Sequence, residues 1–418
     1  MSSRTAERLG AGRWLEIGAL PATTIESTHE LSTVDGAKIT GVLRTVPGAA
    51  TVVAIAHPRQ DVTHHVLVPE LLARGFAVWT QGMRSPNNDI ALLHEQALLD
   101  VAAGVAFVRN RFDAVVTLGH SGGGTLFAFY HEQAGLLPEQ RLRTGQTGRP
   151  TGFAEADLVV PDAAVFLAPH PGQGALLLRL IDPSVVDESD PLSIDASLDP
   201  YDPANGFAAP GEPSHYEPAF VERYRAAQLA RVRRIDAQAT AWAAEAGEAR
   251  AAFKNSDDPV DRRRALAPRI LTVYRTDADL RGVDPSIDPN DRPYGSLFGR
   301  RPDLTNYGLV GFGRLSTPDA WLSTWSALST NADFVRCAPR VTAATLLVEL
   351  TGDQACFPAD GDRMAAALGA ADLSRAAVDG THFGGALHRG GPTGAALAAE
   401  RIGDWLGDRF RAAPHPST

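Results

Sequence analysis

Short apolar runs alternate with segments of helical periodicity along the first part of the chain. The runs are four to six residues long, as in strands buried on both faces of a parallel sheet, and cover 51–56, 77–80, 114–118 and 163–168. In the intervening segments apolar residues recur at helical spacing, which predicts helices over 66–74, 91–109 and 122–131. Strands that alternate with helices predict a mostly parallel α/β sheet flanked by helices on both faces.

Two other parts of the chain extend this sheet. Residues 26–45 form two runs around Asp35-Gly36, and because Asp-Gly is a strong hairpin signal they predict an antiparallel pair of strands. Near the other end of the chain the alternation of strands and helices resumes. The expected strands lie at 344–350 and around 375–378, and the expected helices near 360–368 and at 394–410.

The alternation is interrupted in the middle of the chain. Residues 181–216 and 277–305 are rich in Asp and Pro, which is typical of loops. The alanine-rich, charge-laced segment 218–253 predicts one long helix, and the aromatic and apolar residues of 309–334 predict packed helices. We therefore expect one catalytic domain with a large, mainly helical cap insertion. The expected boundaries are 1–171 for the first part of the catalytic domain, 172–338 for the cap and 339–418 for the second part.

The run at 114–118 leads into a motif that can carry a nucleophile. Its residues are Gly119-His120-Ser121-Gly122-Gly123, and a segment with helical character follows. A serine at the tip of a tight strand-to-helix turn has strained backbone angles, and its neighbours must be small for the chain to fold back. The start of the helix then directs backbone N–H groups at a developing oxyanion. This context makes Ser121 the candidate nucleophile.

The run AVVTLGHSGGGTL resembles the nucleophile elbow of the α/β-hydrolase superfamily. HPRQ, at 57–60, lies where that family places its oxyanion-hole loop, and LLARGFAVWTQGMR resembles the helix, strand and loop before the elbow. TGDQACFP and DGTHFGG fall where the family keeps its acid and its histidine. The resemblance covers about 30–180 and 340–410 and identifies no subfamily, and it implies the α/β-hydrolase fold with a serine esterase-like triad.

A serine hydroxyl needs a base to take its proton, and an anion usually orients that base. In this fold the triad residues follow in the order serine, acid, histidine. His382 meets this demand because it lies late in the chain, on a loop of small residues after a short strand. His388, six residues further on, is the nearest rival for the base.

The predicted acid is Asp353, which directly follows the strand ATLLVEL. Many members of the family carry the aspartate slightly later, in a pattern like Gly-x-x-Asp, and Ala355 occupies the matching position here. Other carboxylates therefore remain open as substitutes, since only geometry defines a triad. These substitutes are Glu349, Asp360 and Asp182.

The expected oxyanion hole combines the N–H of Gly122 with one from the loop after Ala56. Pro58 has no N–H, so Arg59 is the candidate for the second donor, with Gln60 behind it. The side chain of His57 is expected to fix this loop by hydrogen bonding.

These residues predict a serine hydrolase that cleaves a carboxylic ester, a thioester or a lactone through an acyl-enzyme on Ser121. No metal or organic cofactor is expected. An amidase or a carbon–carbon bond hydrolase with the same triad stays open, because the fold alone does not choose between them. A hydrolase-like protein that binds a ligand without turnover is the alternative of another class.

The amino-acid composition limits the kinds of partner and location that we expect for the protein. A hydrophobic content of 44% indicates a globular protein, and a formal charge of −10 argues against a nucleic-acid partner. Two cysteines do not support a disulfide scaffold, and with no apolar run of membrane-spanning length the expected location is the cytoplasm. The substrate is expected to be a small molecule, and a homo-oligomer remains open. Aromatic residues of the cap that can line an apolar acyl or aromatic pocket are Tyr216, Tyr224, Phe298, Tyr307, Phe312, Trp321 and Trp325.

Overall fold

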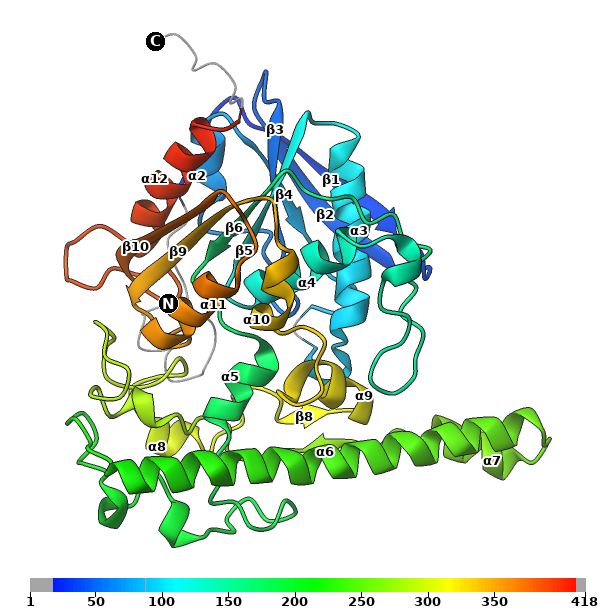
Figure 1. Ribbon diagram of the computed structural model, residues 1–418, viewed down its shortest axis with the longest axis vertical. Coiled ribbons are helices and arrows are strands. Elements are labelled where there is room, and N and C mark those ends of the chain that lie inside the picture. Colours follow the sequence, from blue (N-terminus) through cyan, green and yellow to red (C-terminus); the bar gives the residue numbers. More distant parts are fainter. Residues whose placement is uncertain (1–17, 87, 411–418) are drawn as a thin grey trace.

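An eight-stranded sheet forms the centre of the computed structural model, which describes residues 18–86 and 88–410 (Figure 1). The strand order is β1-β2-β4-β3-β5-β6-β9-β10. β2 pairs antiparallel with β1 and β4, and every other neighbouring pair is parallel, as the sequence predicted. The strands are β1 (Ile25–Ser32), β2 (Lys38–Thr45), β3 (Thr51–Ile55), β4 (Ala77–Gln81), β5 (Ala114–His120), β6 (Ala163–Leu167), β9 (Ala344–Gly352) and β10 (Leu373–Thr381).

Helices cover both faces of this sheet, and each face has its own apolar core. One face carries α2 (Val68–Ala73) and α12 (Gly394–Gly407), and the other carries α3 (His94–Arg109), α4 (Gly122–Ala134) and α11 (Pro358–Ala367) (Figure 1). Successive residues of β3 point to opposite cores, because side chains alternate along a strand. Both faces being buried explains why the central strands are uniformly apolar.

A long helical insertion separates β6 from β9. Its main element is α6 (Pro218–Lys254), which at 37 residues is about 55 Å long and runs beneath the sheet domain in Figure 1. All buried residues of α6 lie between Phe220 and Ala239, and its far end projects with α7 (Pro259–Leu266). The smaller elements are α5 (Gln173–Leu180), β7 (Leu271–Thr272), α8 (Pro302–Thr305), β8 (Leu315–Ser316), α9 (Pro318–Ala320) and α10 (Phe334–Cys337).

The expectation of packed helices over 309–334 was wrong. This stretch holds strand β8, one short helix in which α9 continues into the π-helical turn Trp321–Trp325, and the start of α10. Its hydroxyl groups bond to distant partners: Thr324 Oγ1 donates to the Leu92 carbonyl, and Ser326 Oγ donates to Asp236 on α6. These bonds fix the stretch against other elements, and its aromatic side chains Trp321 and Trp325 are buried although the regular structure is short.

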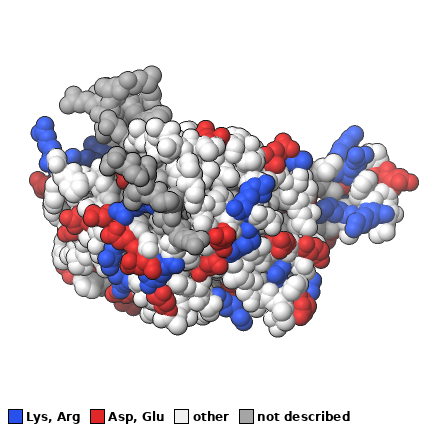
Figure 2. Space-filling model, turned by 90° about the horizontal axis from the view of Figure 1, so that it is seen from above, with Lys and Arg blue, Asp and Glu red and all other residues white. Residues whose placement is uncertain are grey.

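Acidic and basic side chains are mixed over the face seen from above (Figure 2). The net charge of −10 is a small excess of 49 acidic over 39 basic residues. Within residues 18–86 and 88–410, the helices are all too short or too polar to span a bilayer. Both cysteines, Cys337 and Cys356, are free and buried.

Candidate active site

Ser121 occupies a strained turn between β5 and α4. Its φ of 57° and ψ of −125° lie in a region that side-chain-bearing residues rarely adopt. The turn is possible because two neighbours lack a side chain. A Cβ on Gly119 would lie 2.5 Å from backbone atoms of Gly123, and a Cβ on Gly123 would collide with the carbonyl oxygen of Ala56. The serine hydroxyl is thereby presented at the carboxyl end of the sheet.

Two later strands bring the other predicted residues to this hydroxyl. Asp353 directly follows β9 and His382 directly follows β10, so both lie at the same edge of the sheet as Ser121. His382 Nε2 lies 2.8 Å from Ser121 Oγ, and His382 Nδ1 lies 2.9 Å from each carboxylate oxygen of Asp353. All three are buried. The chain therefore places a hydroxyl, an imidazole and a carboxylate in one hydrogen-bonded series.

The carboxylate of Asp353 is held by more than the histidine. Its Oδ1 accepts the N–H groups of Ala355 at 2.6 Å and Cys356 at 2.9 Å. Ala355, which occupies the acid position of the Gly-x-x-Asp pattern, thus supplies a backbone donor to Asp353. Such donors orient the carboxylate toward the imidazole.

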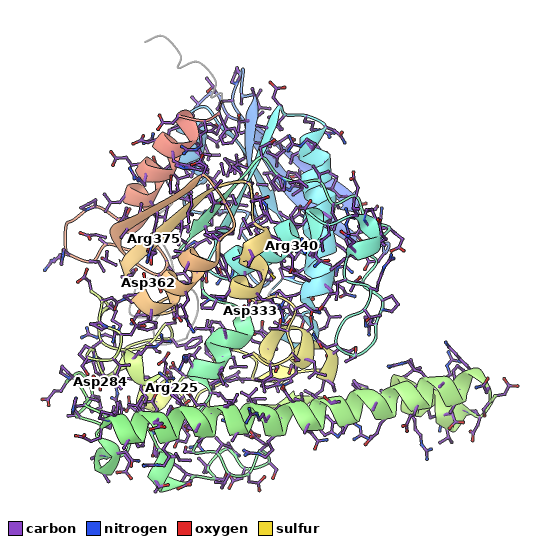
Figure 3. The ribbon with its side chains drawn as sticks, in the orientation of Figure 1. Arg225, Asp284, Asp333, Arg340, Asp362 and Arg375 are labelled. Carbon is purple, nitrogen blue, oxygen red and sulfur yellow. The ribbon has the colours of Figure 1, made fainter. Side chains whose placement is uncertain are left out.

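The substitute acids are engaged elsewhere. Glu349 pairs with Arg375 of β10. Arg375 also binds Asp362 of α11, and Figure 3 labels these last two residues. Asp360 binds Arg281 and Arg363, and Asp182 binds Ser184 and Asn306. The ring that contacts Ser121 is that of His382, not that of its rival His388.

Neither a protein-family model nor a curated protein sequence matches the chain. A solved structure that does match is the hypothetical protein PA2218 from Pseudomonas aeruginosa, at 12% identity over 96% of this chain and 100% of that chain, with a TM-score of 0.50. The DcsB complex with its substrate analogue matches at 12% identity over 92% and 100%, with a TM-score of 0.46. Carboxyl esterase 2 from Tuber melanosporum matches at 12% over 96% and 91%, with a TM-score of 0.45.

The strand order and the strained serine at the end of β5 decide the fold. This is an α/β-hydrolase fold. Within it, the insertion between β6 and β9 separates the strand that leads to Ser121 from the two strands that precede Asp353 and His382.

Two further histidines hold the His382 loop of this α/β-hydrolase fold. His120 Nε2 lies 2.9 Å from the carbonyl oxygen of His382, and His120 Nδ1 lies 3.1 Å from His65 Nε2. Burial lowers the pKa of His120 to about 4 and that of His65 to about 3, so both rings are neutral near pH 7. A neutral ring has one donor and one acceptor, so His65 donates to His120 and His120 donates to the His382 carbonyl. The sequence carries no pattern that reveals this arrangement.

The loop after β3 was expected to offer the N–H of Arg59 as the second oxyanion donor, but this N–H is hydrogen-bonded within the loop. The N–H groups of Arg59 and Gln60 donate to His57 Nδ1, at 3.0 Å and 2.9 Å. The guanidinium of Arg59 makes two 2.6 Å hydrogen bonds to Asp89 and lies over the ring of Phe312. His57 therefore fixes the loop, as expected, and the Arg59 N–H is used within the loop. Gly122 is the first residue of α4, so its N–H has no acceptor within the helix.

Few of the seven aromatic residues named from the sequence lie near the triad. Phe298, Phe312 and Phe383 pack against one buried cluster, which contains Ala355 together with three leucines of the insertion. Tyr216 and Tyr224 are buried in one core of the insertion, Trp321 and Trp325 in another, and Tyr307 is exposed.

Proposed function

We propose that this protein is a serine hydrolase that cleaves a carboxylic ester, thioester or lactone. The observation that carries the proposal is the hydrogen-bonded series from Ser121 Oγ through His382 to Asp353, with distances of 2.8 Å and 2.9 Å. Its support is geometric, because an imidazole within hydrogen-bond reach of a hydroxyl can act as its base.

The proposed reaction uses only these side chains and water. Ser121 Oγ attacks the carbonyl carbon while its proton passes to His382 Nε2. When the tetrahedral intermediate collapses, the bond to the leaving oxygen or sulfur breaks and His382 gives that atom the proton. Water then attacks the acyl-enzyme, loses its proton to His382, and releases the acid and free Ser121. Asp353 holds the imidazole in the required orientation and stabilises its charged form.

We further propose that residues 172–338 form a cap over this site, between catalytic parts at 1–171 and 339–418. Phe298 and Phe312 support this role, because they extend from the insertion to the loops that carry Asp353 and His382. An apolar acyl or aromatic group of a small-molecule substrate is the matching chemistry for these rings.

Ser121→Ala tests the nucleophile. We expect the wild type to be labelled by a fluorophosphonate probe and to hydrolyse short or medium p-nitrophenyl esters. The variant should lose labelling and its kcat should fall by about 10⁴-fold or more, since only binding and oxyanion stabilisation would remain. Circular dichroism spectra of both proteins check that the fold is kept.

His382→Ala and His388→Ala form a matched pair for the base. The first should abolish turnover and the second should leave it near the wild-type level. Absence of labelling and turnover in the wild type would overturn the proposal. Labelling of Ser121 without ester turnover would instead point to an amide or carbon–carbon substrate.

A further inference from the structure

Three buried polar side chains converge on the space beside Gly122. A Cβ placed on Gly122 would lie 3.1 Å from His57 Nε2, 3.2 Å from His170 Nε2, and in collision with Gln173 Nε2. The three residues are at most 5% exposed and come from two sources, the loop after β3 and the segment that leads into α5. The missing side chain of Gly122 therefore leaves room for three nitrogen atoms next to the nucleophile.

Hydrogen bonds on the far side of each group show that these nitrogens carry hydrogen. His57 Nδ1 accepts two backbone N–H groups, so the ring proton lies on Nε2. His170 Nδ1 accepts the N–H of Gly172 at 3.1 Å, which places its proton on Nε2 as well. Gln173 Oε1 lies 3.1 Å from His94 Nε2, so its amide nitrogen faces Gly122. We name this set (His57, His170 and Gln173) the donor cluster.

The donor cluster is neutral and unpaired in the part of the chain that the structure describes. Burial holds the pKa of His57 well below its usual value and lowers that of His170 to about 3. Each ring therefore keeps a single N–H near pH 7. No described residue accepts a hydrogen bond from His57 Nε2, His170 Nε2 or Gln173 Nε2. The three residues are buried, but these nitrogens are not among the fully enclosed atoms, so they face space that a small molecule can enter. Three donors directed at one point of that space indicate a place for an acceptor oxygen.

We propose that the donor cluster, with the N–H of Gly122, binds the carbonyl oxygen of the substrate and stabilises the oxyanion. His57 Nε2 is the second oxyanion donor, in place of a backbone N–H from its own loop. This inference rests on the proposed function, because the oxyanion forms only when Ser121 attacks a carbonyl. The N–H groups of Arg59 and Gln60 act indirectly. By donating to His57 Nδ1 they fix the orientation of the ring and its tautomer.

His57→Asn and His57→Gln separate the two nitrogens of the ring. Asparagine keeps an acceptor near the position of Nδ1 and removes the Nε2 donor, whereas glutamine extends an amide nitrogen to the position of Nε2. We expect kcat of the asparagine variant to fall by about 10²- to 10³-fold with little change in KM, since loss of one oxyanion donor has this effect. The glutamine variant should retain a clearly higher kcat than the asparagine variant.

A trifluoromethyl ketone that adds to Ser121 provides a readout that a merely structural role would not change. ¹⁹F NMR follows ionisation of its hemiketal, and loss of a donor should raise the pKa of that hydroxyl. His170→Asn, which keeps an acceptor for the Gly172 N–H, should shift it in the same direction, and this second variant serves if His57→Asn does not fold. His131→Gln is the control, because His131 is a buried histidine on α4 that bonds to Thr117.

The donor cluster and the serine hydrolase function can fail separately, and different results would show this. Wild-type kcat and wild-type hemiketal pKa in both asparagine variants would overturn the donor cluster while leaving the nucleophile in place. A wild type that neither labels at Ser121 nor forms the adduct would overturn the proposed function itself.

Discussion

At the scale of single residues, the site depends on short polar contacts in a buried setting. Asp353 is 1% exposed, yet each of its oxygens has a partner among His382, Ala355 and Cys356. A buried carboxylate is tolerated only when it is hydrogen-bonded in this way. Under the proposed function, removing its charge should change the tautomer and orientation of the His382 imidazole without emptying the space.

Asp353→Asn should therefore be nearly inactive. We expect kcat to fall by about 10⁴-fold, because an amide can donate to the imidazole and stabilise the wrong tautomer. Glu349→Gln is the matched control, since Glu349 lies on the same strand end but pairs with Arg375. Steady-state hydrolysis of the same ester compares the two. A loss in Glu349→Gln with activity kept in Asp353→Asn would contradict this assignment.

The sequence was sufficient to predict that Ser121, His382 and Asp353 lie together, but not what surrounds them. Ser121, Asp353 and His382 could be named because each follows a recognisable apolar strand. The engagement of the Arg59 N–H by His57 could not be predicted, because it depends on a side-chain rotamer two residues away. The same is true of His65 and His120, which lie 55 residues apart and meet only in the folded chain.

At the scale of elements, the turn from β5 into α4 shows how closely backbone segments approach. The Cα of Gly123 lies against the end of β3, with no room for a methyl group beside the Ala56 carbonyl. A backbone atom cannot move aside as the end of a side chain can. The glycine is therefore required by packing between elements, not by its own backbone angles.

Gly123→Ala should destabilise the fold by several kcal/mol, because relief of the clash requires a shift of β3 or α4. Gly247→Ala is the opposite control. It lies inside α6 with nothing within 4 Å of an added Cβ, so alanine should stabilise the protein by up to about 1 kcal/mol. Urea unfolding midpoints of both variants measure the difference, and equal midpoints would contradict this account.

Elements with regular apolar periodicity were predicted well, and the long helix 218–253 matches α6 almost residue for residue. The prediction was wrong at 309–334, where several hydroxyl groups bond to other elements. Apolar content predicted burial there correctly, since Trp321 and Trp325 are buried. It did not predict regular backbone, because long-range hydrogen bonds are not visible in a local pattern.

At the scale of the whole molecule, the fold buries many neutral histidines. Six have a pKa lowered mainly by burial, namely His57, His65, His94, His120, His131 and His170. In the unfolded chain each returns to a pKa of about 6.5. Asp277, whose pKa burial raises to about 6, acts in the opposite direction. Burial also raises the pKa values of Asp100, Asp199 and Asp236 above that of an ordinary aspartate.

Stability should therefore decline as the pH falls below about 6.5. Between that value and the lowered pKa of about 4 or 3, the unfolded chain binds protons that the folded chain does not, so acid favours unfolding. The urea midpoint should change little from pH 8 to 7 and fall clearly from 6.5 to 5. His131→Gln should reduce this pH dependence by up to about one proton, and a midpoint independent of pH across this window would contradict the account.

The position of the insertion also sets the delay between the synthesis of Ser121 and that of His382. His382 follows Ser121 by 261 residues, with the whole of α6 between them. At a synthesis rate of about 5–20 residues per second, the growing chain carries the serine for roughly 13 to 50 s before its base exists. Under the proposed function, the hydroxyl is inert throughout that interval. The protein would thus acquire its reactivity only after His382 has been synthesised and β10 has joined the edge of the sheet.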